Sequence, residues 1–294
     1  MAAASASSFV SPRQRHRLRR RLTDGLGWTV STVAFLLLGA ATVSIFWAIA
    51  ARGAHALDLA IFTQVTQGTA GGLLNAIEGT LLLAAGGLLL AIPPGVAAGI
   101  FLAEFGASRF APVLRFMSDV LVGLPSIVVG YFVYIVAVVD LGWGFSALAG
   151  AIALAIISLP YITRTSEMAF RQVPADMRDA ARALGATDSH VILRICLPIA
   201  ASNVLTGVLL ALAISVGETA PLLYTAGWSN YMWNGHLTHE PVGYLTYAIW
   251  AFITEPFQSA HALAYAAALL VSAFVLVISI ASRMLMAASR RPGR

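Results

Sequence analysis

Long apolar runs separated by short polar segments are the feature that most restricts the fold of this chain. Six runs are long enough, or nearly so, for the roughly 20 residues that a helix needs to cross a bilayer. They are Trp28–Ala51, Leu81–Ala103, Val120–Val139, Phe145–Ile162, Leu197–Val216 and Ala262–Ala281. With 59% hydrophobic and only 11% charged residues over 294 positions, the chain is too apolar for a soluble domain. The sequence therefore predicts an all-α, polytopic membrane protein with six transmembrane helices.

The arginines predict how these helices are oriented. All 18 basic residues are arginines, and all except Arg52 lie before the first run or in the segments that follow the second, fourth and sixth runs. Because cytoplasmic segments are enriched in basic residues, we expect both termini on the cytoplasmic side of a cell (inner or plasma) membrane. The basic start, Arg13 to Arg21, precedes a run that is too long for a signal-peptide core. We interpret it as a cytoplasmic anchor, not as a nucleic-acid-binding tail.

Residue types that are scarce in the chain argue against several activities. The sequence has no lysine, so a phosphate-gripping P-loop cannot be present and any ATP hydrolysis must come from another chain. The single cysteine, Cys196, excludes an internal disulfide and a cysteine-based zinc site. His236 and His239 have only Glu240 as a further nearby ligand, which is too few for a metal site. We therefore expect no catalytic residues, no metal and no cofactor.

A polar segment from Pro174 to Pro198 interrupts the apolar runs. Its residues predict two short helices joined at Gly185, which suits the left-handed residue that ends a helix. Thr187 or Asp188 can cap the second helix. One face of the first helix carries apolar side chains, namely Met177, Ala180, Ala181 and Leu184. Such a hairpin must meet water or a partner protein.

Within this segment the chain resembles the permeases of ABC importers. Asp179, Ala180, Ala181, Gly185, Ile195, Leu197 and Pro198 match the spacing of their E-A-A-x3-G-x9-I-x-L-P loop, with Asp179 in place of the usual Glu. The resemblance implies the type I importer permease fold, and it implies that this loop is the coupling helix that lies in a groove of the ATPase subunit. A cytosolic helical hairpin without a partner is the alternative.

Further motifs are similar to those of phosphate permeases. They are Gly71 to Thr80, Ile100 to Phe105, Leu124 to Val128, and Gly217 to Leu223, which reads G-E-T-A-P-L-L. The last is typical of the PstA type of subunit, in contrast to its PstC-type partner. The resemblance implies a permease subunit of an ATP-driven importer of inorganic phosphate, which is not itself an enzyme. The alternatives are the permease of another oxyanion importer (phosphonate, molybdate or sulfate) and an ATPase-independent secondary carrier, which the near absence of ionisable groups in the spans disfavours.

The same resemblance implies the partners of the chain. These are a second permease of the PstC type, two ATP-binding subunits of the PstB type, a secreted or periplasmic phosphate-binding protein of the PstS type, and the lipid bilayer, with no nucleic acid.

We expect the chain to divide into four parts. They are a basic cytoplasmic arm (1–25), the first span and outer loop (26–76), the permease domain (77–282) with the coupling loop (163–196), and a basic cytoplasmic tail (283–294).

Candidate residues of the substrate pathway are Glu218, Thr219, Pro125 and Ser126. An ionised Glu218 can accept the proton of hydrogenphosphate, which sulfate lacks, and could therefore discriminate between the two anions. Phosphate permeases commonly have a basic residue three positions before the Gly of G-E-T, but Ile214 occupies it here. Two alternatives stay open: Glu218 as a solvated helix end, and Pro125 as a packed kink instead of a flexible point of the pathway.

Two smaller expectations concern helix ends and helix packing. Glu104 and Asp119 flank a short loop that contains Arg109 and Arg115, and we expect ion pairs there that help to seat the ATPase. Two glycine-containing pairs, Gly79 with Thr80 and Gly86 with Gly87, are expected to allow close helix packing. In the aromatic-rich last outer loop, residues 244–254 are predicted to form a helix at the outer leaflet.

Overall fold

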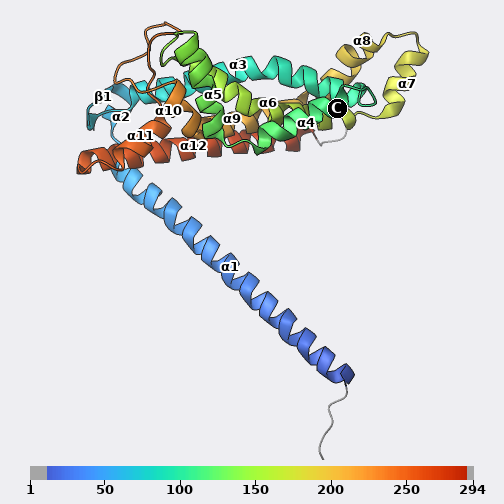
Figure 1. Ribbon diagram of the computed structural model, residues 1–294, viewed down its shortest axis with the longest axis horizontal. Coiled ribbons are helices and arrows are strands. Elements are labelled where there is room, and N and C mark those ends of the chain that lie inside the picture. The colour runs from blue at the N-terminus through green and yellow to red at the C-terminus, as the bar shows by residue number, and fades with distance from the viewer. Residues whose placement is uncertain (1–11, 290–294) are drawn as a thin grey trace, which may run out of the picture. The chain divides into compact units, whose positions relative to one another are not determined.

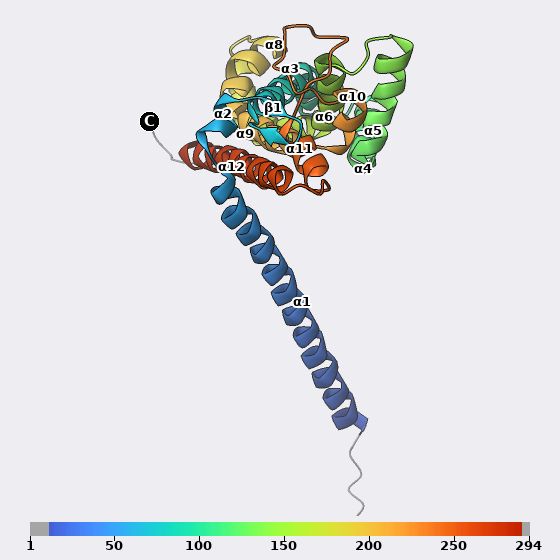
Figure 2. The same ribbon diagram turned by 90° about the vertical axis from the view of Figure 1, so that its left-hand side faces the viewer.

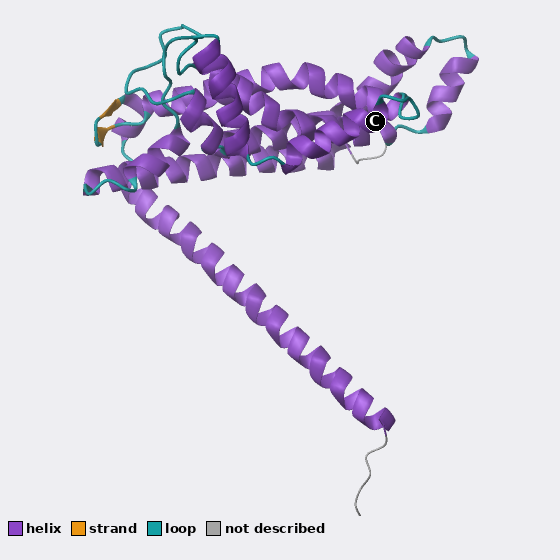
Figure 3. Ribbon diagram, in the orientation of Figure 1, coloured by secondary structure: helices purple, strands orange, loops and turns teal. Residues whose placement is uncertain are grey.

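The helices of the computed structural model follow the predicted runs with one exception (Figures 1 and 3). The structure describes the backbone of residues 12–289 and the side chains of residues 23–286. Five helices in this part of the chain are long and apolar enough to cross a membrane: Thr23–Ala56, Leu74–Glu104, Ala147–Arg171, Asp188–Gly217 and Gln258–Met286. A sixth candidate is a bent pair of helices, Ala111–Gly123 and Ser126–Asp140. The chain is therefore a multi-pass, all-α membrane protein.

The element order is that of a helical bundle with short connections. In chain order the elements are α1 (Pro12–Ala56), α2 (Leu59–Thr63), β1 (Thr66–Gln67), β2 (Ala70–Gly71), α3 (Leu74–Glu104), α4 (Ala111–Gly123), α5 (Ser126–Val133), the π-helix η1 (Tyr134–Asp140), α6 (Ala147–Arg171), α7 (Ala175–Ala183), α8 (Asp188–His190), the π-helix η2 (Val191–Cys196), α9 (Leu197–Gly217), α10 (Ala220–Thr225), α11 (Leu245–Phe252) and α12 (Gln258–Ser289). Helix α11 confirms the helix predicted within residues 244–254.

The first span and the bundle are separate compact units. Residues up to Ala51 form one unit, and residues from Arg52 onward form the other. Taken by itself, α1 is a 45-residue helix that contains the predicted first span. The predicted basic arm (1–25) and basic tail (283–294) lie partly outside the described residues.

The predicted third span, Val120–Val139, is wrong as a single helix. Helix α4 ends at Gly123, helix α5 begins at Ser126, and the two helices are bent by 101°. Pro125 is the physical cause, because proline lacks a backbone N–H and disfavours helical geometry in the residue before it. Both Leu124 (ψ 132°) and Pro125 (ψ 133°) accordingly have extended ψ angles. Apolar character is the same on both sides of the break, so the run of apolar residues did not reveal it.

Helices α3 and α6 pack closely because glycines line their contact. A Cβ atom added at Gly87 would lie 2.8 Å from Cβ of Leu154, and one at Gly99 would lie 2.4 Å from Cβ of Ser166. Both pairs have the same sequence offset, so the two helices run parallel. Small residues let the two backbones come close together. Close packing is important in a membrane, because the hydrophobic effect does not drive helices together in lipid. The predicted packing role of Gly87 is confirmed.

The predicted role of Gly79 and Thr80 in helix–helix packing is wrong. A Cβ atom at Gly79 would lie 1.9 Å from the carbonyl oxygen of Gly243, which belongs to the loop before α11. The hydroxyl of Thr80 accepts a hydrogen bond from the backbone N–H of Leu245 at 2.9 Å. These two residues hold a loop, which lies more than 160 positions away in the sequence.

Asn75, one turn earlier on α3, holds two further segments. Its side-chain oxygen accepts hydrogen bonds from the backbone N–H and the hydroxyl of Thr66, both at 3.0 Å. Its side-chain nitrogen donates to the carbonyl oxygen of Ser229 at 2.8 Å. Asn75 and Thr66 are both 1% exposed, so these bonds satisfy polar groups that water cannot reach.

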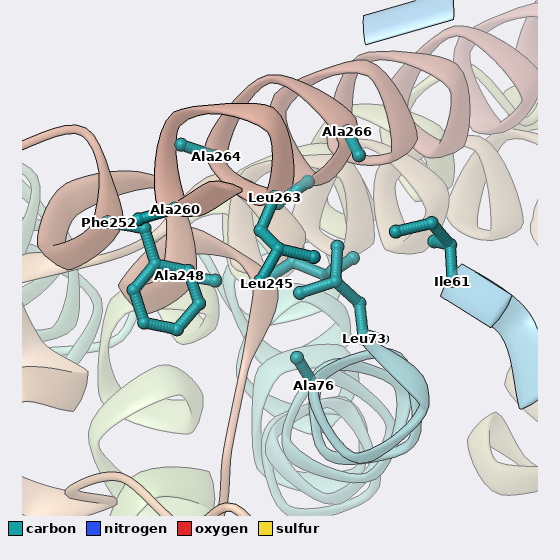
Figure 4. Close-up of a cluster of buried hydrophobic side chains, with 11 residues drawn as sticks. Ile61, Leu73, Ala76, Leu245, Ala248, Phe252, Ala260, Leu263, Ala264 and Ala266 are labelled. Atoms are coloured by element: carbon teal, nitrogen blue, oxygen red, sulfur yellow. The ribbon is translucent and has the colours of Figure 1, made fainter. Parts of the chain in front are cut away.

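An apolar cluster closes this end of the bundle (Figure 4). It joins the start of α3 to α11, α12 and α2, and its members include Ile61, Leu73, Ala76, Leu245, Ala248, Phe252, Ala260 and Leu263. Figure 1 shows α2, β1 and α11 at one end of the bundle, and α7 and α8 at the opposite end. Figure 2 shows the same bundle turned by 90°. The polar segment that contains α7 and α8 therefore lies at the opposite end from the aromatic-rich loop before α11.

A buried ion pair attaches α7 to the bundle. Nη1 of Arg178 lies 2.8 Å from Oε1 of Glu104, at the last residue of α3, and Nη2 of Arg178 donates to the carbonyl oxygen of Phe170. The side chains of Glu104 and Arg178 are 6% and 15% exposed. The expectation that Glu104 pairs with Arg109 or Arg115 is therefore wrong. Glu104 fixes α7 instead.

Removing one charge of this pair is expected to destabilise the protein. Glu104→Gln leaves the guanidinium of Arg178 buried without a counter-charge, which costs about 3–5 kcal/mol. Thermal unfolding of the detergent-solubilised protein should show this as a clear fall in Tm. Arg164→Gln is the matched control, because it removes an exposed ion pair, with Asp119, that is worth about 1 kcal/mol or less. Equal falls in Tm for the two variants would contradict the assignment.

Candidate functional site

The segment from Pro174 to Pro198 forms the predicted pair of short helices, which we call the coupling hairpin. Helix α7 ends at Ala183, and Gly185 then takes a left-handed conformation (φ +83°) that turns the chain. The backbone N–H of Gly185 bonds to the carbonyl of Arg182 at 2.9 Å, and that of Ala186 bonds to the carbonyl of Ala181 at 3.1 Å. The hydroxyl of Thr187 accepts from the N–H of His190 and caps the next helix.

The hairpin borders an open hollow of about 500 Å³. Its lining includes three of the residues identified from the sequence, Ala181, Gly185 and Ile195, together with Leu184, Ala186, Thr187 and His190. Leu184 is 90% exposed and Met177 is 49% exposed, so part of the predicted apolar face of α7 is left uncovered. Ala181 instead packs against Phe170 and Val191.

The remaining predicted residues of the hairpin do not line the hollow. Asp179 is exposed and forms an ion pair with Arg182 at 3.5 Å. Arg182 also donates from Nε to Asp188 at 3.1 Å, and this hydrogen bond holds the pKa of the Arg182 guanidinium above its ordinary value. Leu197 and Pro198 follow the π-helix η2 directly, inside the continuous helix Asp188–Gly217.

A second set of ion pairs lies near the same end of the bundle. Glu167 on α6 is 15% exposed and contacts both Arg115 (3.0 Å) and Arg171 (2.8 Å). Asp119 on α4 pairs with Arg164 on α6. Asp119 and Arg115 were expected to form pairs around the α3–α4 loop, and they instead bind residues of α6. These pairs tie α4 to α6.

The candidate pathway residues come together where two helices break. Helix α9 ends at Gly217, Glu218 is extended (ψ 135°), and α10 begins at Ala220. The hydroxyl of Ser126, the first residue of α5, lies close enough to the carboxylate of Glu218 to interact with it. The motifs L-P-S-I-V and G-E-T-A-P-L-L, about 90 positions apart, therefore build one polar site.

Close backbone contact keeps these two breaks together. A Cβ atom at Gly130 would lie 2.4 Å from Cα of Pro221, so α5 and α10 touch without an intervening side chain. We call this contact the α5–α10 seam. The hydroxyl of Thr246 on α11 donates to the carbonyl oxygen of Glu218 at 2.7 Å. The backbone of Glu218 is thus held from a third element.

Thr219 and Pro125 shape the site without adding a polar contact from their side chains. The carbonyl oxygen of Thr219 accepts from the N–H groups of Leu222 and Leu223, which starts α10. Pro125 produces the break before α5 and is exposed in this chain. Ile214, at the position where phosphate permeases commonly carry a basic residue, brings no charge to the site.

Sequence reasoning missed several residues that position the site. Asn75 and Thr246 hold distant segments through hydrogen bonds, and Arg178 pairs with Glu104. Asn75 gave a usable signal, because a polar side chain at the start of an apolar helix must find partners when it is buried. Thr246 gave none, since hydroxyls are common in membrane helices.

Comparisons with known proteins agree with this geometry. Residues 95–291 match the family described as binding-protein-dependent transport system inner membrane component. The phosphate transport system permease protein PstA 2 of Mycobacterium bovis is 42% identical over 280 residues, which cover 95% of this chain and 93% of that protein. The phosphate transport system permease protein PstA of Haemophilus influenzae is 41% identical over 263 residues, covering 85% and 92%.

A solved structure has the same fold. A chain of the MetNI methionine ABC transporter, in an inward-facing conformation, superposes with a TM-score of 0.59 and covers 75% of this chain and 95% of its own length. Its sequence identity is 18%, so the likeness shows the fold alone. The coupling hairpin, the broken helices and the long sequence matches lead to one conclusion: the chain belongs to the family of binding-protein-dependent transport system inner membrane components.

Proposed function

We propose that this chain is the PstA-type permease subunit of an ATP-driven importer of inorganic phosphate. The observation that carries the proposal is the contact of α5 with α10, which brings Ser126 next to Glu218 and joins two of the motifs that are similar to those of phosphate permeases. Relatives of 42% and 41% identity bear the name of phosphate permeases and support it. In this role the chain is a transport subunit, and ATP is hydrolysed by separate ATP-binding subunits.

The coupling hairpin is the contact with one of those ATP-binding subunits. Exposed Leu184 and Met177 offer an apolar face, and Asp179 and Arg182 offer charges beside it. Such a helix fits the groove of a partner protein. Because Glu104 forms an ion pair with Arg178 of α7, a displacement of α7 by the ATPase also moves the end of α3.

Glu218 is the group that recognises phosphate. Its carboxylate can accept the O–H of hydrogenphosphate, and sulfate, which is unprotonated at neutral pH, would leave that acceptor unpaired. With Ile214 at the usual basic position, the positive charge beside the anion comes from the second permease, of the PstC type. The pathway then lies between the two permeases, and a phosphate-binding protein of the PstS type delivers the anion from outside.

The proposed orientation places the coupling hairpin and both termini in the cytoplasm. The loop that joins η1 to α6 and the loop between α10 and α11 then lie outside. The domain divisions stay as proposed from the sequence, with the permease domain over residues 77–282 and the coupling loop over 163–196. Alternation of access is a rocking of the two permeases as the ATPases close.

A permease for another oxyanion is the second candidate. Phosphonate, molybdate and sulfate importers belong to the same class, and the observation that favours this candidate is the uncharged Ile214 beside Glu218. Competition between these anions in uptake assays separates the candidates. A secondary carrier is disfavoured, because the middle of the spans carries almost no ionisable group.

The first prediction from the proposed function concerns the turn of the hairpin. Gly185 has a positive φ and no atom within 4 Å of an added Cβ, so a substitution there acts through the backbone alone. Gly185→Val should lower transport and the stimulation of ATPase activity at least tenfold, because a β-branched residue resists the left-handed conformation. Gly185→Asn is the control, since asparagine tolerates that conformation, and it should keep most activity. Normal uptake by the valine variant would refute the coupling role.

The second prediction concerns orientation. In a Cys196→Ala background, a cysteine at exposed Ser189 should react with a membrane-impermeant thiol reagent only from the cytoplasmic side. A cysteine at Tyr231, which is 80% exposed, should react only from outside. Labelling of intact cells tests the outer side, and labelling of inverted vesicles tests the cytoplasmic side. Reversed labelling would overturn the proposed topology.

The third prediction concerns Glu218. Glu218→Gln keeps one acceptor oxygen but loses the charge, so a charge-assisted bond of roughly 1.5–3 kcal/mol becomes an ordinary one. Phosphate uptake should fall about ten- to a hundredfold, with arsenate falling in parallel, while the complex still assembles. Asp140→Asn, which removes an exposed acid at the end of η1, should leave uptake unchanged. Uptake by the glutamine variant at the wild-type rate would show that Glu218 is only a solvated helix end.

A further inference from the structure

Three tyrosines gather on the α5–α10 seam. Tyr131 lies on α5, Tyr134 on η1 and Tyr224 on α10. The ring centroids are 6.0 Å apart for Tyr131 and Tyr134, 6.0 Å for Tyr131 and Tyr224, and 6.2 Å for Tyr134 and Tyr224. Each ring therefore contacts the other two. We call these residues the tyrosine triad.

The rings of the triad pack against other aromatic rings, whereas their hydroxyls have no hydrogen-bond partner among the described residues. Phe145 stacks on Tyr134 at 6.2 Å and supports the triad from the loop before α6. Within the described part of the chain, none of the three hydroxyls forms a hydrogen bond. Tyr131 is 54% exposed, and Tyr134 and Tyr224 are half-buried. The triad thus presents three free O–H donors on a fixed aromatic frame.

The triad is close to the Ser126–Glu218 site along the same seam. Tyr131 is five residues beyond Ser126 on α5, which is a rise of about 7–8 Å. Tyr224 is six residues beyond Glu218, and the contact of Gly130 with Pro221 lies between the two levels. Figure 1 shows α5 and α10 toward the end of the bundle opposite α7. In the proposed orientation, an anion coming from outside passes the triad before it reaches Glu218.

The chemistry of phenol hydroxyls suits an anion that must be held briefly. A tyrosine O–H donates a hydrogen bond to an oxyanion but adds no positive charge. It therefore orients the anion without binding it so strongly that release becomes slow. This property matters here, because neither α5 nor α10 carries a basic side chain and Glu218 repels an anion that lacks a proton. Donors of moderate strength allow an ion to enter a site and also to leave it.

We propose that Tyr131, Tyr134 and Tyr224 form an outer hydrogen-bonding station that takes an oxyanion from the outside and passes it to the Ser126–Glu218 site. The station rests on the proposed function, since it needs an importer of oxyanions. Its ligand class is the tetrahedral oxyanion, with phosphate as the expected member. The competing role is that of an interfacial aromatic belt, in which rings anchor the helix and hydroxyls matter little for transport.

Phenylalanine variants separate the two roles, because they keep the rings and remove only the hydroxyls. In proteoliposomes that contain the complete importer, we would compare the wild type with Tyr131→Phe, Tyr224→Phe and the double variant. The binding protein, loaded with phosphate, is supplied at saturation, so its own affinity does not affect the rate. Uptake and ATP hydrolysis are measured in the same sample. Tyr231→Phe, in the outer loop, is the matched control.

Each single variant should lower the maximal uptake rate about three- to tenfold, and the double variant should lower it at least tenfold, since an ordinary hydrogen bond is lost at each position. ATP hydrolysis stimulated by the binding protein should persist, so the number of anions imported per ATP falls. Tyr231→Phe should keep both rates within about twofold. A merely structural role would lower uptake and ATP hydrolysis together and leave their ratio unchanged.

Wild-type uptake and coupling in the double variant would overturn the proposal, as would an unchanged ratio. If the wild-type complex imports sulfate, molybdate or phosphonate instead of phosphate, the proposed substrate is wrong. The number of those anions imported per ATP, compared between the wild type and the phenylalanine variants, then tests the station. If the complex imports none of these anions, both proposals are wrong.

Discussion

Backbone at membrane depth must have its polar groups satisfied by protein or by a water-lined cavity, and the architecture of this chain follows from that requirement. Two membrane segments break, one at Leu124–Pro125 and one at Glu218–Thr219. The two breaks lie close together, because α5 contacts α10, and the hydroxyl of Thr246 satisfies the carbonyl oxygen of Glu218 at the second break. The interruption thus creates a polar site at the seam.

Helix α3 connects this site to the rest of the molecule. At one end, Asn75 and Thr80 hold the loops that lead to α11, the helix that carries Thr246. At the other end, Glu104 holds Arg178 and with it the coupling hairpin. Along its middle, glycines let α3 lie against α6. One helix therefore links the proposed ATPase contact to the support of the proposed substrate site.

Much of this fold could be predicted from the sequence, because long apolar runs and a left-handed glycine are local signals. The spans and the turn at Gly185 follow from such signals. The direction of α5 after Pro125 could not be predicted, since proline marks a break but not the angle. Partners such as Arg178 for Glu104, or Ser126 for Glu218, depend on which helices become neighbours. Resemblance to phosphate permeases marked Ser126 and Glu218 as candidates but not as partners.

The central claim is that the Ser126–Glu218 site lies on a water-filled route for the anion. The most direct measurement is the reactivity of a cysteine at position 126, in a Cys196→Ala background of the assembled importer, toward a small charged thiol reagent. The account predicts reaction that slows when phosphate-loaded binding protein and ATP are supplied, while a cysteine at Val277, 64% exposed on α12, stays unreactive in lipid. A cysteine at 126 that does not react, or reacts at a rate indifferent to phosphate, would contradict it.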